Sequence, residues 1–139
     1  MDELDSLLDE LERKIDQEER ARYSARVIDH ARNPRNLGRM ERAEASAVVK
    51  GWCGDTMELY LRLGPGGRIE AAAFMTDGCG STLACGSMLT VILQGKSIDE
   101  ALRISPQELI AALGGLPADS AHCAELAVKT LRAALANRG

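Results

Sequence analysis

The chain has 139 residues, of which 45% are hydrophobic and 27% charged, and this predicts one globular domain with a modest core. Its net charge of −4 and its 3% of aromatic residues argue against nonspecific nucleic-acid binding, which needs basic surfaces and stacking platforms. Because no apolar run is long enough to span a bilayer and the N-terminus is acidic, we expect a cytoplasmic protein with no membrane span. Cysteines in that compartment stay reduced and serve metals or redox chemistry.

Residues 2–22 predict an amphipathic helix. Its apolar side chains recur at helical spacing, at Leu4, Leu7, Leu8, Leu11 and Ile15. We expect this leucine stripe to pack on the helix's own domain rather than on a partner. A short second helix should run from Ser24, its N-cap, to Arg32, because Asn33-Pro34 breaks the pattern there.

The middle of the chain predicts strands. Residues 47–49 lead into a turn at Cys53, and Met57, Leu59, Leu61 and Leu63 then alternate with more polar neighbours, as in a half-buried strand. A glycine-rich turn at residues 64–67 joins this strand to a return strand over residues 68–76. Together these segments predict an antiparallel hairpin.

Helices fill the remainder. The first begins at residues 78–81 and continues to about Gln94, where Gly95 closes it. Ser97 caps a short helix over residues 98–102, and Ser105-Pro106 opens another, with Glu108 placed as in a capping box. The last runs from about Ala121 to Asn137. Strands followed by helices predict an α+β domain.

Three cysteines lie where one local pattern ends and another begins. Cys53 is in Cys53-Gly54-Asp55, Cys79 is in Gly78-Cys79-Gly80, and Cys123 directly follows His122. Glycine gives the neighbouring thiols an approachable backbone, and a helix start favours thiolate at Cys79 and Cys123. With Asp55 and His122, these thiols make a ligand set suited to zinc or to an iron–sulfur centre.

The fourth cysteine has a different predicted role. Cys85 lies inside a predicted helix, six residues after Cys79, and buried packing is favoured over ligation there.

Other functions fit the ligand set of three thiols, Asp55 and His122. It would suit a zinc-bound sulfurtransferase or a purely structural zinc module, although an aspartate ligand is unusual in the latter. A Cys–His nucleophilic enzyme would use Cys123, but we expect adjacent side chains to point apart and to leave His122 poorly placed as its base.

Several of these motifs resemble those of the U-type iron–sulfur scaffold family, which comprises IscU and the N-terminal domain of NifU. The resemblance covers about residues 23–135, with the motifs in the same order and at similar spacing. They are residues 23–30, residues 33–36, Cys53-Gly54-Asp55, Gly78-Cys79-Gly80-Ser81, Ser87-Met88-Leu89-Thr90, Gly95-Lys96 and His122-Cys123.

The resemblance implies a fold and a function. Members fold as a small antiparallel sheet of about three strands covered by helices, so residues 23–139 should form that domain and residues 1–22 a helical extension. Members receive sulfur from a cysteine desulfurase, assemble it with iron, and pass the cluster to apo iron–sulfur proteins without turnover of their own. The cofactor would be a 2Fe–2S or 4Fe–4S cluster, built from iron, with zinc able to occupy the cluster-free form.

The resemblance also assigns residues. Cys53, Cys79 and Cys123 match the cluster ligands, Asp55 matches the carboxylate tied to cluster lability, and His122 matches the histidine of the metal site. Cys123 is the expected persulfide acceptor. One departure is Leu116-Pro117-Ala118-Asp119-Ser120, where the family's chaperone-binding stretch reads Leu-Pro-Pro-Val-Lys. This difference argues against recognition by the dedicated Hsc-type chaperone.

Overall fold

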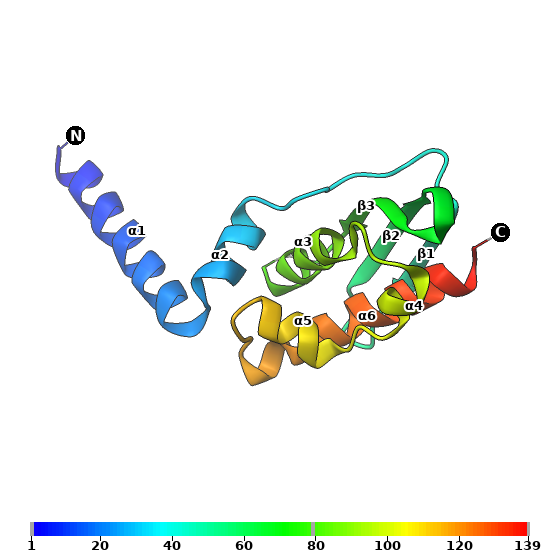
Figure 1. Cartoon of the computed structure of the whole chain (residues 1–139). Coiled ribbons are helices and arrows are strands. Elements are labelled where there is room, and N and C mark those ends of the chain that lie inside the picture. Colours follow the sequence, from blue (N-terminus) through cyan, green and yellow to red (C-terminus); the bar gives the residue numbers. More distant parts are fainter. Residues whose placement is uncertain (1, 79, 139) are drawn as a thin grey trace.

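The computed structural model describes residues 2–78 and 80–138 (Figure 1). Its elements follow the predicted order, two helices, three strands and then a helical half, and the α+β class is confirmed. They are α1 (Asp2–Arg22), α2 (Ala25–Arg32), β1 (Ala45–Lys50), β2 (Thr56–Leu63), η1 (Pro65–Gly67), β3 (Ile69–Thr76), α3 (Ser81–Leu93), α4 (Ile98–Leu102), α5 (Pro106–Ala112), η2 (Ala118–Ser120) and α6 (Ala121–Ala136).

The three strands form one antiparallel sheet in the order β1-β2-β3. Alternation along β2 is as predicted, because Met57, Leu59 and Leu61 are fully buried between more exposed neighbours. Helix α6 packs on β1 and β2, and α3 packs on β3, so the core lies between the sheet and these two helices (Figure 1). Gly86 permits the close approach of α3, since a Cβ there would lie 2.4 Å from the Phe74 ring.

Helix starts follow the predicted caps with one difference. Ser24 accepts a hydrogen bond from the Val27 N–H, and Ser105 accepts one from the Glu108 N–H at 3.1 Å. The full capping box, however, is formed by Ser97 and Glu100, where both reciprocal bonds are present. Among the helices of residues 2–78 and 80–138, none is long and apolar enough to cross a membrane.

The expectation that the leucine stripe of α1 packs on its own domain is wrong. The five side chains of the stripe are between 48% and 63% exposed, and none of the residues of α1 is buried. Figure 1 shows the reason: α1 projects away from the body of the protein and contacts it through its C-terminal half, chiefly at α2. The apolar periodicity predicted the helix correctly, but periodicity does not reveal what covers the apolar face.

A buried polar cluster fastens α2 and the segment after it to α3. Ser87 accepts a hydrogen bond from the Arg35 N–H at 2.8 Å, and its hydroxyl lies 2.7 Å from His30 Nδ1. His30 and Ser87 are both buried. Burial lowers the pKa of His30, the charge of Arg35 lowers it further, and Asp29 opposes them. The cluster therefore favours a neutral imidazole that accepts from Ser87.

We expect this histidine to make stability depend on pH. A histidine whose pKa is lower in the folded state than its value of 6.5 in the unfolded chain binds fewer protons when folded. Its contribution to stability is complete above that value and is lost as the pH falls below it. Chemical unfolding from about pH 7.5 to about pH 5.5 should show a smaller loss in His30→Gln than in wild type. Equal losses in the two proteins would contradict this prediction.

Candidate metal centre

Three segments that are distant in sequence meet at one end of the sheet. The turn between β1 and β2 is closed by a hydrogen bond from the Gly51 N–H to the Asp55 carbonyl, at 2.8 Å. The first turn of α3 reaches this turn through Thr82, and α6 reaches it through Leu126, which packs beside Gly51. The antiparallel strand order thus brings the start of α3 to the Cys53 turn, and the packing of α6 on β1 and β2 brings the start of α6 there too.

A buried hydroxyl joins Asp55 to Cys123. Thr82 Oγ1 lies 2.8 Å from Asp55 Oδ2 and 3.3 Å from Cys123 Sγ. Thr82 is 1% exposed and Cys123 is 5% exposed, so this contact is sheltered from water. Because a hydroxyl carries one hydrogen, Thr82 can donate to the carboxylate or to the sulfur, but not to both at once.

Glycine makes room for this carboxylate. A Cβ at Gly78 would lie 2.6 Å from Asp55 Oδ2 and 2.8 Å from the Cβ of Thr82. Any side chain at position 78 would therefore displace Asp55 or Thr82. The glycine of the Gly78-Cys79-Gly80 motif thus has a steric role at the carboxylate, in addition to the chain flexibility that the sequence suggests.

Cys53 occupies the exposed side of the same region. A cavity of about 180 Å³ is lined by Trp52, Cys53, His122, Glu125 and Lys129, together with Gly51 and Leu126. The rings of Trp52 and His122 lie with their centroids 5.1 Å apart and their planes tilted by 55°. Cys53 is exposed, in contrast to Cys123, so one thiol faces solvent and the other is sheltered.

The expectation that His122 and Cys123 point apart is wrong. His122 Nε2 lies 3.7 Å from Cys123 Sγ, which is within hydrogen-bonding distance for sulfur. Consecutive Cα–Cβ directions do diverge on a helix, but the imidazole is long enough to fold back over the next residue. The imidazole of His122 is therefore close enough to the Cys123 thiol to share a proton with it.

The described residues do not form a ready-made coordination shell. Within residues 2–78 and 80–138, no three side chains of His, Cys, Asp or Glu are placed to hold a metal ion together. The prediction for Cys79 lies outside the described residues. Asp55 and Cys123 meet at Thr82, whereas Cys53 and His122 line the neighbouring cavity. A complete site from these four residues needs a further ligand or a movement of the Cys53 turn.

Cys85 is buried in the core, as the sequence indicates. It has no exposed surface and belongs to the apolar cluster that includes Leu89 and Ala84. Burial raises the pKa of its thiol well above the ordinary range, and a negative charge on Cys123 would raise it further. A thiol held neutral is a poor metal ligand and a poor nucleophile, which supports the packing interpretation.

Sequence reasoning did not single out Thr82 or Trp52. Thr82 could have been found, because a hydroxyl in the first turn of a helix next to the Gly78-Cys79-Gly80 motif lies close to whatever that motif binds. Trp52 directly precedes Cys53 and is the only tryptophan of the chain. Their contacts with Asp55, Cys123 and His122 arise from the tertiary arrangement, so position in the sequence alone does not predict them.

Most of the chain matches the model of one protein family. The model of the NifU-like N-terminal domain matches residues 22–138, which is most of the chain. The chain belongs to this family. The match confirms the resemblance drawn from the motifs, whereas the division into residues 1–22 and 23–139 stays a prediction.

Curated relatives agree with this membership. The chain is 43% identical over 114 residues to the iron–sulfur cluster assembly scaffold protein IscU 1 of Archaeoglobus fulgidus, covering 81% of this chain and 74% of that protein. It is 40% identical over 119 residues to the scaffold protein IscU of Escherichia coli K12, covering 83% and 92%. It is 39% identical over 119 residues to the scaffold protein IscU of Haemophilus influenzae, covering 83% of this chain and 94% of that protein.

Solved structures confirm the fold. A protein of Fervidobacterium islandicum, described as a candidate cluster assembly scaffold of the SUF system, superimposes with a TM-score of 0.65 at 22% identity, covering 81% of this chain and 96% of that one. The N-terminal part of a NifU-like protein of Brucella abortus gives 0.53 at 20% identity, covering 78% and 76%. The three-stranded sheet with its covering helices is thus the fold that these proteins share.

Proposed function

We propose that this chain is an iron–sulfur cluster assembly scaffold that receives sulfur from a cysteine desulfurase and passes its cluster to apo-proteins. The observation that carries the proposal is the meeting of Asp55 and Cys123 on one buried hydroxyl, in a chain about 40% identical to IscU scaffolds. A carboxylate and a thiol brought together where the Cys53 turn meets the first turns of α3 and α6 make a site that suits iron and its exchange.

Each ligand has a proposed role. Cys53, Cys79 and Cys123 hold the cluster through their thiolates, and Asp55 supplies a harder, more exchangeable oxygen ligand. His122 stands at the metal site beside Cys123. Iron and sulfur are cargo here, so the protein acts by binding and release.

Sulfur enters through Cys123 in this proposal. The Cys123 thiolate attacks the terminal sulfur of the persulfide on the donor protein, a new S–S bond forms on Cys123, and the donor's thiolate leaves. The proximity of His122 Nε2 supports this step, because the imidazole can take the proton of the thiol. A thiol reductant then supplies the two electrons that convert the transferred sulfur to sulfide for the cluster.

The Cys53 turn is the element that would close the site. Trp52, Cys53 and Gly54 are all exposed, and Gly54 adopts a φ of 99°, a conformation that other residues rarely reach. An exposed turn of this kind can rearrange at low cost in packing. We infer that Cys53 moves toward Asp55 and Cys123 when iron binds.

Reconstitution without oxygen tests the function. Given iron(II), cysteine, dithiothreitol and a cysteine desulfurase, the protein should gain visible charge-transfer absorption, with iron and acid-labile sulfide in matching amounts. The signal should depend on the desulfurase, and the loaded protein should restore an apo-ferredoxin. Stoichiometric zinc without iron uptake, together with sulfur transfer to a second protein, would instead identify a zinc-bound sulfurtransferase.

A further inference from the structure

The leucine stripe of α1, defined by Leu4, Leu7, Leu8, Leu11 and Ile15, forms a continuous apolar strip that the protein leaves uncovered. These residues follow one another at spacings of three and four or are direct neighbours, so they share one side of the helix. Each is about half or more exposed. Five large apolar side chains exposed on one helix are unusual for a surface helix and mark a binding surface.

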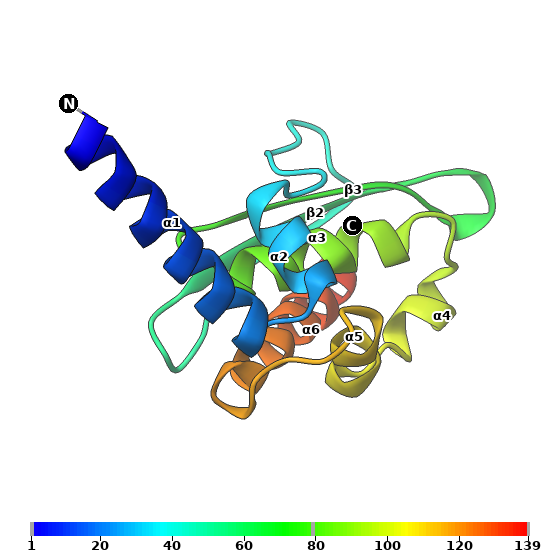
Figure 2. The same ribbon diagram turned by 90° about the vertical axis from the view of Figure 1, so that its left-hand side faces the viewer.

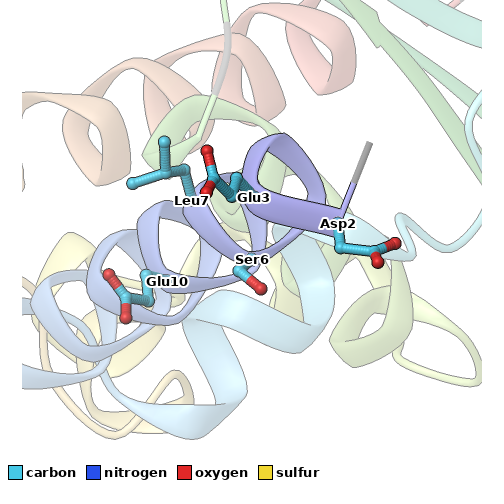
Figure 3. A pocket seen from close by; sticks show the side chains of 5 residues that line it. All are labelled: Asp2, Glu3, Ser6, Leu7 and Glu10. Atoms are coloured by element: carbon cyan, nitrogen blue, oxygen red, sulfur yellow. The ribbon is translucent and has the colours of Figure 1, made fainter.

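The charge of α1 indicates which partner fits this strip. The helix has nine acidic residues and four basic ones, in a chain whose net charge is −4, so it carries the negative excess of the protein. Figure 3 shows Leu7 beside Glu3, with Asp2 and Glu10 on either side along the helix. Two copies of so acidic a helix would repel each other, whereas a groove with an apolar floor and a Lys/Arg rim would complement it.

The ion pairs of α1 lie in its second half and fasten it to the domain. Asp16 and Glu19 both pair with Arg32 of α2, at 3.2 and 2.9 Å. Within residues 2–78 and 80–138, the acidic side chains in the first half of α1, at positions 2–12, form no ion pair. The half that carries most of the stripe is therefore the half whose charges are available to a partner.

The fastened end of α1 lies beside the candidate metal centre. Arg22 pairs with Asp119, three residues before His122. Glu19 lines a hollow together with Gly80 and Ser81, at the start of α3. A protein that brings sulfur to Cys123 must reach this end of the molecule, and α1 extends outward from it (Figure 2).

We propose that α1 is a docking arm for the sulfur-donor protein, whose basic-rimmed apolar groove takes the leucine stripe. This inference rests on the proposed function, because the donor is the desulfurase that loads Cys123. The arm adds contact area outside the site and holds the donor near Cys123, which raises the effective concentration of its persulfide. Because α1 is already helical before binding, less conformational entropy is lost when the donor docks on it.

The test measures the affinity of the full chain for the desulfurase of the same organism by titration calorimetry. The double variant Leu7→Ala, Leu11→Ala removes two apolar contacts, and alanine preserves the helix. Its Kd should rise about tenfold or more, as for the loss of contacts at the centre of an interface. The matched control Leu102→Ala removes an exposed leucine on α4, away from α1, and should bind as wild type does.

Salt dependence tests the charge argument. The Kd of wild type should rise with salt, and Asp5→Asn, Asp9→Asn should weaken binding at low salt and flatten that dependence. The inference is overturned if the leucine variant binds as tightly as wild type, if wild type does not bind the desulfurase, or if sedimentation shows a dimer that the leucine variant loses. The last outcome would assign the stripe to a second copy.

Persulfide formation separates this inference from the proposed function. With limiting desulfurase the leucine variant should load Cys123 more slowly than wild type, and with excess desulfurase it should reach the same final load. If wild type acquires sulfur but the leucine variant acquires it equally fast, the inference that α1 is a docking arm is wrong and the proposed scaffold function stands. If wild type acquires no sulfur on any cysteine, the proposed function itself fails.

Discussion

Replacing Cys123 with serine should lower sulfur receipt by about 100-fold or more, because a serine hydroxyl is almost fully protonated and a weak nucleophile where a thiolate is a strong one. The change is nearly isosteric, and position 123 is buried at the start of α6, so the fold should remain. Mass spectrometry of the desulfurase-treated proteins should find the added sulfur on Cys123 of wild type and not on the Cys123→Ser variant. Cluster assembly should fail in the same variant.

Cys85 provides the matched control. It is also a buried cysteine, but its thiol has a raised pKa, so Cys85→Ala should accept sulfur and assemble a cluster as wild type does. The cost should be a loss of about 1 kcal/mol in the free energy of unfolding, as for a small buried group. Normal sulfur receipt by a folded Cys123→Ser variant would show that another cysteine is the acceptor. Loss of the cluster in folded Cys85→Ala would make Cys85 a ligand.

Local structure could be predicted from the sequence because it depends on interactions between residues that are close together in the chain. Serine caps at Ser24, Ser97 and Ser105, together with the glycine turn at residues 64–67, mark where elements begin and end. The alternation in β2 and the periodicity of α6 likewise follow from which side chains face the core. These signals depend on neighbours within a few residues, so one sequence suffices to read them.

The tertiary contacts of the site could not be predicted in this way. Thr82 meets Asp55 across 27 positions and Cys123 across 41 positions, and no local pattern encodes such a meeting. The apolar stripe of α1 shows the same limit, since its periodicity is identical whether its own domain or a partner covers it. The proximity of His122 and Cys123 was missed for a different reason, because ring length outweighed the divergence of adjacent Cβ directions.

Replacing Asp55 with alanine should slow the transfer of a loaded cluster about tenfold, which corresponds to about 1.4 kcal/mol in the transfer barrier. Thiolates bind iron covalently and tightly, whereas a carboxylate oxygen exchanges more readily and opens a route for an acceptor's ligand. Assembly should suffer less, provided that Cys53, Cys79 and Cys123 still anchor iron. The measurement loads wild type and Asp55→Ala with cluster, adds apo-ferredoxin and follows its restoration.

Two further variants distinguish a ligand from a structural carboxylate. Asp55→Asn keeps an oxygen that can accept from Thr82 Oγ1 but removes the negative charge, so it should transfer as slowly as Asp55→Ala if ligation matters. Thr82→Val removes the hydroxyl and keeps the carboxylate, so its transfer rate should stay near that of wild type. Fast transfer by Asp55→Ala, in a protein that remains folded, would reduce Asp55 to a turn residue. Slow transfer by Thr82→Val with fast transfer by Asp55→Asn would assign the effect to the hydrogen bond, because Asp55→Asn keeps that bond without the charge and Thr82→Val keeps the charge without the bond.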